Sequence, residues 1–368
     1  MQALILAGGQ GTRLRPLTLT TPKPVLPLAG RPFLTLVLDW LAGHGVDEAI
    51  LSCGFLADEV ARVLGDRHGD VALHYVTESE PLGTAGPVRL ALDEGRLRER
   101  VIVLNGDVLT DFDLTAEVDF HARAGALATL ALVAVDDTSS YGLVPTAAGG
   151  EVEAFLEKGE GVGAARPTNR VNAGAYVLER EVVERIPSGR AVSFEREIFP
   201  ALVRDRLFGH PVEGYWIDIG APERYLEATY DLLGGAVASA LPPRDAGGSL
   251  VAPGCAVEEA EIGPLSVLGE GCRIRRGARV ARSVLFRGVE IAPDAVVEGA
   301  VVAEEAEIGA AARVGAGAVV GGRARVAPGA DVPPGTRIGP TTEFGRSDEA
   351  DAHAAGARGG GEPAGDPA

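Results

Sequence analysis

The chain has 368 residues, of which 46% are hydrophobic and only 5% aromatic, and one hydrophobic core seldom organises so long a chain. Its 34 basic and 52 acidic residues give a formal net charge of -18, which argues against a nucleic-acid partner because such a surface repels a phosphate backbone. No apolar run approaches the roughly 20 residues of a membrane span, and the N-terminal segment lacks the basic region typical of a secretory signal. The three scattered cysteines form no metal-binding spacing and no disulfide framework. We therefore expect a cytoplasmic protein with no membrane partner and more than one domain.

The N-terminal part of the chain alternates strand-like and helical patterns. This succession predicts a mostly parallel, three-layer, Rossmann-like α/β domain over residues 1–233. A glycine- and proline-rich linker is predicted at 234–250. Strands are predicted at 3–7, 49–53, 71–76, 101–104, 127–135, 152–156 and 173–178, and helices at 32–42, 58–64, 86–93, 194–204 and 222–233.

After the linker, single aliphatic residues recur every six positions, with two slips of one residue. A hexapeptide repeat is typical of a parallel β-helix, in which one aliphatic side chain per short strand fills a narrow interior. This spacing predicts a β-helix over 251–340 and disfavours the alternative, a disordered Ala/Gly/Val-rich segment. Residues 341–368 are rich in alanine and glycine, and we expect them to be a disordered tail. The repeating residues are Ile262, Leu268, Ile274 and Val280, then Leu285, Ile291 and Val297, then Val302, Ile308, Val314, Val320, Val326, Val332 and Ile338.

Two lysines, Lys23 and Lys158, stand among basic residues that are otherwise all arginine. Lysine is a compact point charge on a flexible stem, whereas arginine is a wide planar fork, so these positions are candidates for a special role. Lys23 follows a glycine-rich loop at residues 6–13 that matches neither the Walker A pattern nor the dinucleotide fingerprint. Its glycines would still allow backbone N–H groups to close on a phosphate or a base, with Arg13 and Lys23 as counter-charges.

Two carboxylates are candidate metal ligands. Asp107 directly follows the predicted strand 101–104, and ligands of parallel α/β sheets collect beyond the carboxyl ends of the strands. Asp218 lies between a strand-like stretch at 214–217 and the helix that opens at residue 222. Two loop carboxylates and a triphosphate could together hold Mg²⁺, which favours mixed shells of protein, phosphate and water oxygens. The spacing alone does not show that Asp107 and Asp218 meet.

Six motifs, taken together, resemble a known family. GGQGTRLRPLT followed by PKP, then EPLGTAGP, NGD, FLEK, NAG and WIDIG, appear in the order found in sugar-1-phosphate nucleotidyltransferases. The resemblance spans about residues 1–340 and is closest to the mannose-1-phosphate guanylyltransferase group with a C-terminal left-handed β-helix. It implies the left-handed winding, which the repeat period does not give. One departure from the family pattern is Gly159, which follows Lys158 where the family commonly has proline.

The resemblance implies a role for each matching residue. Arg13, Lys23 and Lys158 are the implied catalytic cations, and Asp107 and Asp218 the implied Mg²⁺ ligands. Gly142, Glu157 and Asn172 are the implied sugar-binding residues. The implied nucleotide-binding residues are Leu6, Ala7, Gly8, Gly9, Gly11, Thr12, Arg13, Lys23, Leu82, Gly83 and Thr84, with Ala85 beside them.

The implied reaction joins a nucleoside triphosphate to a sugar 1-phosphate and releases pyrophosphate, with GTP and mannose 1-phosphate favoured. Thymidylyltransferases typically carry a glutamine-containing segment where this chain has residues 82–86, but glucose-1-phosphate thymidylyltransferase or another NDP-sugar synthase stays open as an alternative. A non-catalytic regulatory paralogue that binds an NDP-sugar is a second alternative, disfavoured because all the implied cations and carboxylates are present. An acyltransferase role for the β-helix is disfavoured because residues 250–340 contain no histidine. We expect this β-helix to mediate homo-oligomer formation.

Overall fold

The structure of the protein is a computed structural model that describes residues 1–54, 56–139, 141–156, 168–239, 241, 244–245 and 247–345. The chain divides into two compact units, Met1–Leu241 and Pro242–Ala368. The boundary between them falls inside the segment 234–250 that we interpreted as a linker. Most of the predicted disordered tail, from residue 346 onward, lies outside the described residues.

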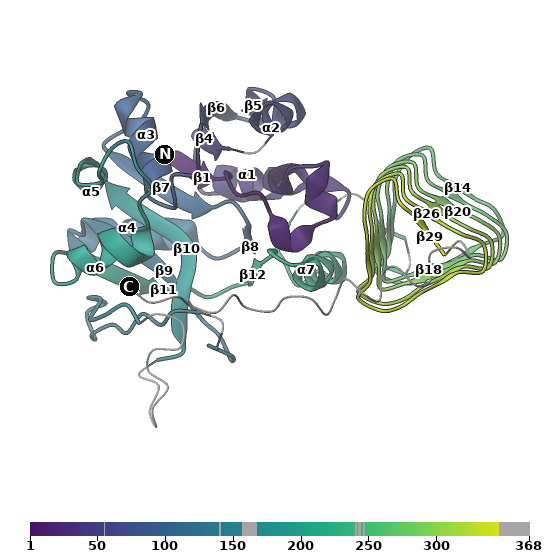
Figure 1. Ribbon diagram of the computed structural model, residues 1–368. Helices are drawn as coiled ribbons and strands as arrows, with labels where there is room; N and C mark the ends of the chain where they lie inside the picture. The colour runs from purple at the N-terminus through teal and green to yellow at the C-terminus, as the bar shows by residue number, and fades with distance from the viewer. Residues whose placement is uncertain are drawn as a thin grey trace, which may run out of the picture. The chain divides into compact units, whose positions relative to one another are not determined.

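The first unit is organised by an eight-stranded sheet with the strand order β11-β9-β10-β7-β1-β4-β6-β5 (Figure 1). Strands β7, β1, β4 and β6 are mutually parallel, whereas β10 runs antiparallel to both β7 and β9. The mostly parallel sheet is therefore confirmed, with β10 reversed inside it. A separate two-stranded sheet pairs β8 with β12. The strands are β1 (Gln2–Leu6), β2 (Pro27–Leu28), β3 (Arg31–Pro32), β4 (Glu48–Cys53), β5 (Arg67–His68), β6 (Val71–Thr77), β7 (Arg100–Asn105), β8 (Val108–Thr110), β9 (Ala128–Ala134), β10 (Arg170–Glu179), β11 (Leu207–Pro211) and β12 (Trp216–Asp218).

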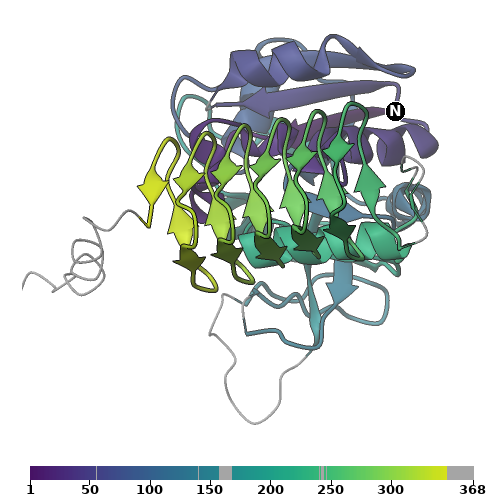
Figure 2. The same cartoon turned by 90° about the vertical axis from the view of Figure 1, so that its right-hand side faces the viewer.

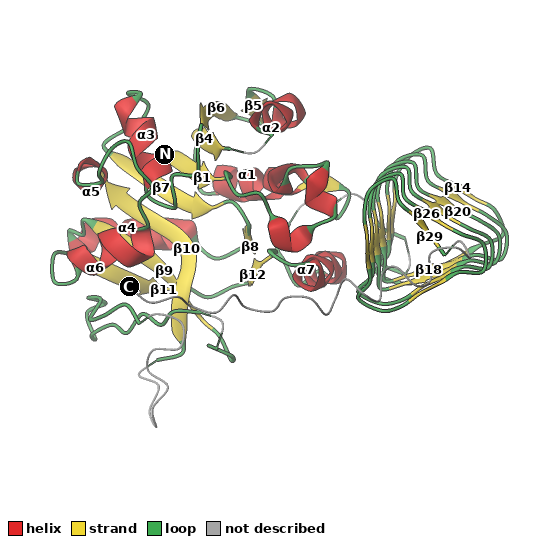
Figure 3. Cartoon of the chain, viewed as in Figure 1, coloured by secondary structure: helices red, strands yellow, loops and turns green. Residues whose placement is uncertain are grey.

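Helices on both sides of this sheet give three layers (Figure 3). Consecutive residues Ala3, Leu4 and Ile5 of β1 are all fully buried, and because side chains of a strand alternate between faces, both faces must be covered. No helix among the described residues is long and apolar enough to cross a membrane. The helices are α1 (Phe33–Gly43), α2 (Ala57–Leu64), α3 (Gly86–Asp93), α4 (Leu114–Ala124), α5 (Arg180–Glu184), α6 (Phe199–Leu202) and α7 (Pro222–Gly234), with 3₁₀ turns η1 (Thr12–Leu14), η2 (Leu17–Leu19) and η3 (Lys23–Val25) and a π-helical turn η4 (Phe194–Ile198).

Two predicted elements differ from the structure. The strand expected at 152–156 is not continuous, because Val152 bridges to Thr146 and Leu156 bridges to Leu143, each as a single pair. The helix expected at 194–204 starts as the π-helical turn η4, continues as α6 and stops at Leu202. Arg204 then takes a left-handed φ of 73°, and a right-handed helix does not continue through a residue in this conformation.

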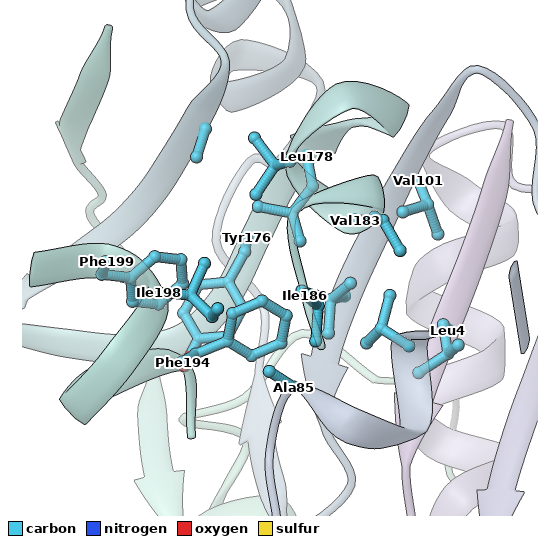
Figure 4. Close-up of a cluster of buried hydrophobic side chains, with 14 of the residues drawn as sticks. Leu4, Ala85, Val101, Tyr176, Leu178, Val183, Ile186, Phe194, Ile198 and Phe199 are labelled. Carbon is cyan, nitrogen blue, oxygen red and sulfur yellow. The ribbon is translucent and has the colours of Figure 1, made fainter. Parts of the chain in front are cut away.

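One face of the sheet packs against α3, α5 and the η4–α6 segment in a single apolar cluster (Figure 4). Leu4 and Val101 contribute from the sheet, and Val183 and Ile186 from α5 and the turn after it. Tyr176 of β10 lies at the other end of this cluster, against aromatic rings from η4 and α6. The η4 turn is thus held by the core and is not a surface loop.

The second unit is a parallel β-helix whose coils stack as rungs (Figure 2). Three parallel sheets form its sides, consistent with the left-handed β-helix that the resemblance implies. Inward residues stack in register, as Leu268 on Leu285 and Leu285 on Val302, and their side chains are essentially buried. The strands are β13 (Leu250–Val251), β14 (Ala256–Val257), β15 (Glu261–Ile262), β16 (Val267–Leu268), β17 (Arg273–Ile274), β18 (Arg279–Ala281), β19 (Val284–Leu285), β20 (Glu290–Ile291), β21 (Val296–Glu298), β22 (Val301–Val302), β23 (Glu307–Ile308), β24 (Arg313–Val314), β25 (Val319–Val320), β26 (Arg325–Val326), β27 (Asp331–Val332), β28 (Arg337–Ile338) and β29 (Glu343–Phe344).

The two slips in the six-residue repeat mark shortened corners of the β-helix. The first shortened corner, between Val280 and Leu285, contains the buried Ser283, whose hydroxyl donates to the Ala281 carbonyl. The Ser283 hydroxyl oxygen also accepts from the Ala300 amide at 3.1 Å, and Ala300 lies in the second shortened corner, between Val297 and Val302. One short polar side chain therefore satisfies backbone groups at both shortened corners.

Candidate active site

A cavity of about 450 Å³ opens beyond the carboxyl ends of β1 and β7. The glycine-rich loop after β1 forms one wall, and the Asn105–Asp107 loop after β7 forms another. Ten of the eleven predicted nucleotide-binding residues line this cavity, Leu82 being the exception. The lining residues are Leu6, Ala7, Gly8, Gly9, Gly11, Thr12, Arg13, Lys23, Pro24, Glu78, Pro81, Gly83, Thr84, Pro87, Asn105, Gly106, Asp107 and Gly220.

Lys23 lies in the wall of this cavity and pairs with Asp107. Its Nζ is 2.9 Å from Asp107 Oδ2, and the residue as a whole is only 8% exposed. The lysine begins the 3₁₀ turn η3, between Pro22 and Pro24, whose fixed φ angles leave this part of the backbone little freedom. A largely buried ammonium thus stands beside one of the two candidate metal ligands.

The pairing of β8 with β12 brings Asp218 to Asp107. Asp218 is opposite Val108 in this two-stranded sheet, and the Ile219 amide donates to the Asp107 carbonyl at 3.0 Å. Burial raises the pKa of Asp218, and the negative charge of Asp107 raises it further, against the opposing effects of Lys23 and Arg13. Arg13 Nη2 lies 3.7 Å from Asp218 Oδ2, with two thirds of the arginine side chain exposed. The structure therefore joins two cations and two carboxylates that are far apart in the sequence.

The donor set at this point fits a metal that is shared with a substrate. No cluster of three or more His, Cys, Asp or Glu side chains that could hold a metal occurs among the described residues. Asp107 and Asp218 supply carboxylate oxygens only, and burial together with the negative charge of Asp107 raises the pKa of Asp218. A hard divalent cation relieves such repulsion and completes its shell with phosphate and water oxygens.

The loop at residues 82–86 is attached to the segment that precedes η4. The Val192 amide donates to the Leu82 carbonyl and the Ala85 amide donates to the Val192 carbonyl, each at 2.9 Å. Gly83 has a left-handed φ of +76°, and a Cβ at this position would lie 2.5 Å from the Val192 carbonyl oxygen. Only glycine therefore fits here without a backbone shift.

The Thr84 hydroxyl is turned away from the cavity that this residue lines. It donates to Glu195 Oε2 at 2.8 Å and accepts from the Phe194 amide at 2.8 Å. The single hydroxyl proton is thus used within the protein.

Two of the predicted sugar-binding residues, Gly142 and Asn172, lie close together but outside the cavity lining. The bridge between Leu143 and Val171 brings their two segments side by side. Asn172 stands at the start of an irregularity in the pairing of β10 with β9, and bulges of this kind commonly re-aim a side chain. Glu157 and Lys158, the other predicted residues on this side, lie outside the described residues.

Glu78, which was not among the predicted site residues, lines the cavity just after β6. Its Oε1 accepts from Ser52 Oγ at 2.9 Å and its Oε2 accepts from the Leu82 amide at 3.1 Å. A Cβ built on Gly8 would come within 2.4 Å of Glu78 Oε1, so this carboxylate packs directly on the glycine-rich loop. The rule that selected Asp107, a polar residue just after a parallel strand, would also have selected Glu78, which follows β6.

Family models match both units. The Nucleotidyl transferase family matches residues 2–234, and the GMPPB C-terminal domain matches residues 246–333. A mannose-1-phosphate guanylyltransferase of Mycobacterium tuberculosis is 42% identical over 305 residues, covering 81% of this chain and 83% of that protein. Mannose-1-phosphate guanylyltransferase 1 of Arabidopsis thaliana is 34% identical, covering 82% of this chain and 86% of that protein. The mannose-1-phosphate guanylyltransferase catalytic subunit beta of Drosophila pseudoobscura is 37% identical, covering 74% and 72%.

Solved structures are also similar to this chain. HddC from Yersinia pseudotuberculosis is similar with a TM-score of 0.52 and 30% identity, covering 62% of this chain and 97% of that protein. A second crystal structure of HddC, complexed with GMP-PN, matches with the same TM-score and coverage.

Proposed function

Because this chain belongs to the mannose-1-phosphate guanylyltransferases, a family of nucleotidyl transferase enzymes, we propose that it makes GDP-mannose and pyrophosphate from GTP and mannose 1-phosphate. The observation that supports this most is a single cavity in which a glycine-rich loop, Arg13, Lys23 and Asp107 meet. Nucleotidyl transfer needs these components, because two highly anionic reactants must be held in one place.

In this reaction a phosphate oxygen of the sugar 1-phosphate attacks the α-phosphorus of the nucleotide, and pyrophosphate leaves. The nucleophile is already an anion at neutral pH, so positioning and charge stabilisation supply the catalysis and no general base is required. Arg13 and Lys23 bind the phosphates of the nucleotide, and the glycine-rich loop orients them through its backbone N–H groups. Asp107 and Asp218 would hold Mg²⁺, which supplies neutralisation of phosphate charge when it is bound.

On the sugar side we propose that Lys158 binds the sugar phosphate, with Glu157, Gly142 and Asn172 around the sugar ring. The position of Asn172 supports this role. The neighbouring Gly174 packs on Asn105, where a Cβ would lie 2.5 Å from Asn105 Nδ2, and Asn105 lines the nucleotide cavity. A sugar held by Asn172 would therefore stand next to the bound nucleotide.

Glu78 supports the choice of guanine as the base. An ionised carboxylate only accepts hydrogen bonds. Guanine presents two adjacent donors, N1–H and the 2-amino group, on its Watson–Crick edge, whereas uracil and thymine present a single N3–H between two carbonyl oxygens. A carboxylate in the wall of the cavity therefore favours guanine over a pyrimidine, and thymidylyl transfer is the alternative that it disfavours.

The proposal is tested by measuring pyrophosphate release with GTP, ATP, UTP, dTTP and ITP, each combined with mannose and glucose 1-phosphates. We expect GTP with mannose 1-phosphate to give the highest kcat/KM. ITP lacks the 2-amino group and should be on the order of tenfold worse, because a hydrogen bond to a charged group stabilises by roughly 1.5–3 kcal/mol. Glu78→Gln should reduce the preference for GTP over ITP, whereas the exposed neighbour Glu80→Gln should not. No turnover with any pair would instead support a non-catalytic regulatory paralogue.

We also propose that the β-helix mediates self-association. Val251 and Val257 on its first coil are 46% and 40% exposed, which is unusual for large aliphatic side chains and suits a contact with a second copy. Light scattering of the wild-type protein should give a multiple of the 37.9 kDa chain mass. The Val257→Asp variant should give a mass closer to that of one chain. A monomer at every concentration would refute this.

A further inference from the structure

A continuous hydrogen-bonded chain links the nucleotide side of the site to the sugar side. Asn172 Nδ2 donates to the Tyr176 hydroxyl at 2.9 Å, and that hydroxyl donates to Glu195 Oε1 at 3.3 Å. The other oxygen of Glu195 accepts from Thr84 Oγ1 at 2.8 Å. Glu195 does not line the cavity, so it acts through the residues that it holds.

The protons of this chain have a fixed direction. Tyr176 is fully buried, and burial together with the neighbouring Glu195 charge raises its pKa well above 10.0, so the hydroxyl keeps its proton. A carboxylate accepts only, hence Tyr176 must donate to Glu195 and can only accept from Asn172. The Asn172 amide is therefore held with its NH₂ group towards Tyr176, while its Oδ1 accepts from the Gly174 amide at 2.9 Å. One Nδ2 proton and one lone pair of Oδ1 remain for a ligand.

The position of Glu195 is set by the π-helical turn η4. Ser193 is the N-cap of this turn, and its hydroxyl donates to Glu195 Oε2 at 2.8 Å. Phe194 packs against Tyr176 with ring centroids 5.5 Å apart, and Figure 4 shows both rings in the buried cluster. π-helical turns are rare and are frequently found at functional sites.

We propose that Glu195 is a positioning residue which fixes the Asn172 amide through Tyr176 and fixes the 82–86 loop through Thr84. This inference rests on the proposed function, because it assumes a sugar at Asn172 and a nucleotide at the loop. One carboxylate then aligns the groups that face both substrates. Glutamine at residue 195 could donate through its amide group, so it would no longer oblige the Tyr176 hydroxyl to accept from Asn172.

Four single variants distinguish the link from Glu195 through Tyr176 to Asn172 from the link between Glu195 and Thr84. Glu195→Gln should raise KM for both the sugar phosphate and the nucleotide, each on the order of tenfold, the scale of one charge-assisted hydrogen bond. Tyr176→Phe keeps the buried ring and should raise only the sugar-phosphate KM. Thr84→Val should raise only the nucleotide KM. Glu197→Gln is the matched control on the same turn, where Glu197 bonds Arg190 and the Ser193 amide, and neither KM should change.

The double variant Glu195→Gln with Tyr176→Phe decides whether Glu195 acts through Tyr176. We expect its sugar-phosphate KM to match that of Tyr176→Phe alone, because residues in one network are not additive. The inference would be overturned if the sugar-phosphate KM of the double variant rose by the product of the two single increases. It would also be overturned if Glu195→Gln behaved like Glu197→Gln. Circular dichroism melting curves show that each variant is folded, and Thr84→Val and Tyr176→Phe test the two links even if the glutamine variant does not fold. All assays use the substrate pair that the wild-type enzyme prefers, so a different pair would refute the proposed function alone.

Discussion

Replacement of Gly83 by alanine tests whether the 82–86 loop must rest on the backbone of Val192. A Cβ at Gly83 would lie 2.5 Å from the Val192 carbonyl oxygen, where ordinary contact begins at 3.4 Å. One of the two backbone segments must therefore move by roughly 0.9 Å to relieve the overlap. The left-handed φ adds about 1–2 kcal/mol for any L-residue. Because a displacement of about 1 Å can cost on the order of 100-fold in rate, we expect kcat/KM for GTP to fall at least tenfold.

The matched control is Gly95→Ala, which takes a similar φ of +70° but has open space around the added Cβ. Both variants should lose about 1–2 kcal/mol of unfolding free energy from the left-handed conformation. Only Gly83→Ala should lose activity in a pyrophosphate-release assay at varied GTP. If both variants kept the same kcat/KM, the contact between the loop and Val192 would not position the nucleotide.

Three further predictions concern other parts of the chain. Lys158→Arg keeps the charge but should lose most of its turnover, because a planar guanidinium does not replace a compact ammonium donor, and near wild-type pyrophosphate release would remove Lys158 from the mechanism. Burial raises the pKa of Glu117 well above 4.5, and neither of its carboxylate oxygens has a hydrogen-bond partner in the part of the chain that the structure describes. The native state therefore keeps the proton of Glu117 at pH values where the unfolded chain has lost it. The contribution to the free energy of unfolding is fully present below pH 4.5 and falls by up to about 1.4 kcal/mol per pH unit as the pH rises towards the folded pKa. Urea unfolding between about pH 5 and 7 should show this slope removed by Glu117→Gln, and an unchanged slope would contradict a protonated Glu117. Ile308→Ala should destabilise the β-helix by about 2–5 kcal/mol, whereas the exposed neighbour Glu307→Ala should change the unfolding free energy by less than about 1 kcal/mol; equal losses would mean that Ile308 does not fill the interior.

The architecture of both units could be predicted because local patterns encode it. The helix at Gly86–Asp93 was predicted with its observed bounds, since its apolar spacing and flanking turns are local features. The six-residue repeat predicted the β-helix, and its two slips fall at the corners where Ser283 and Ala300 lie. The reversed strand β10 had no local signal, because the direction of a strand depends on the connection that leads into it and not on its own residues.

The candidate site likewise combines features that local sequence predicts with features that only long-range contacts create. The glycine-rich loop, Arg13 and Lys23 are close in sequence, so their residue types alone indicated a phosphate-binding loop. Asp107 and Asp218 are brought together by the β8–β12 pairing, a long-range contact that no spacing rule contains. Glu195 lies outside the cavity lining and is linked to Asn172 through the buried Tyr176, which is on the same strand as Asn172, whereas Glu195 lies in the η4 turn. The residue types and their local spacing thus determined which residues could bind phosphate. The packing of distant segments decided which carboxylates lie beside those residues and how the side chains of Asn172, Tyr176 and Thr84 are oriented.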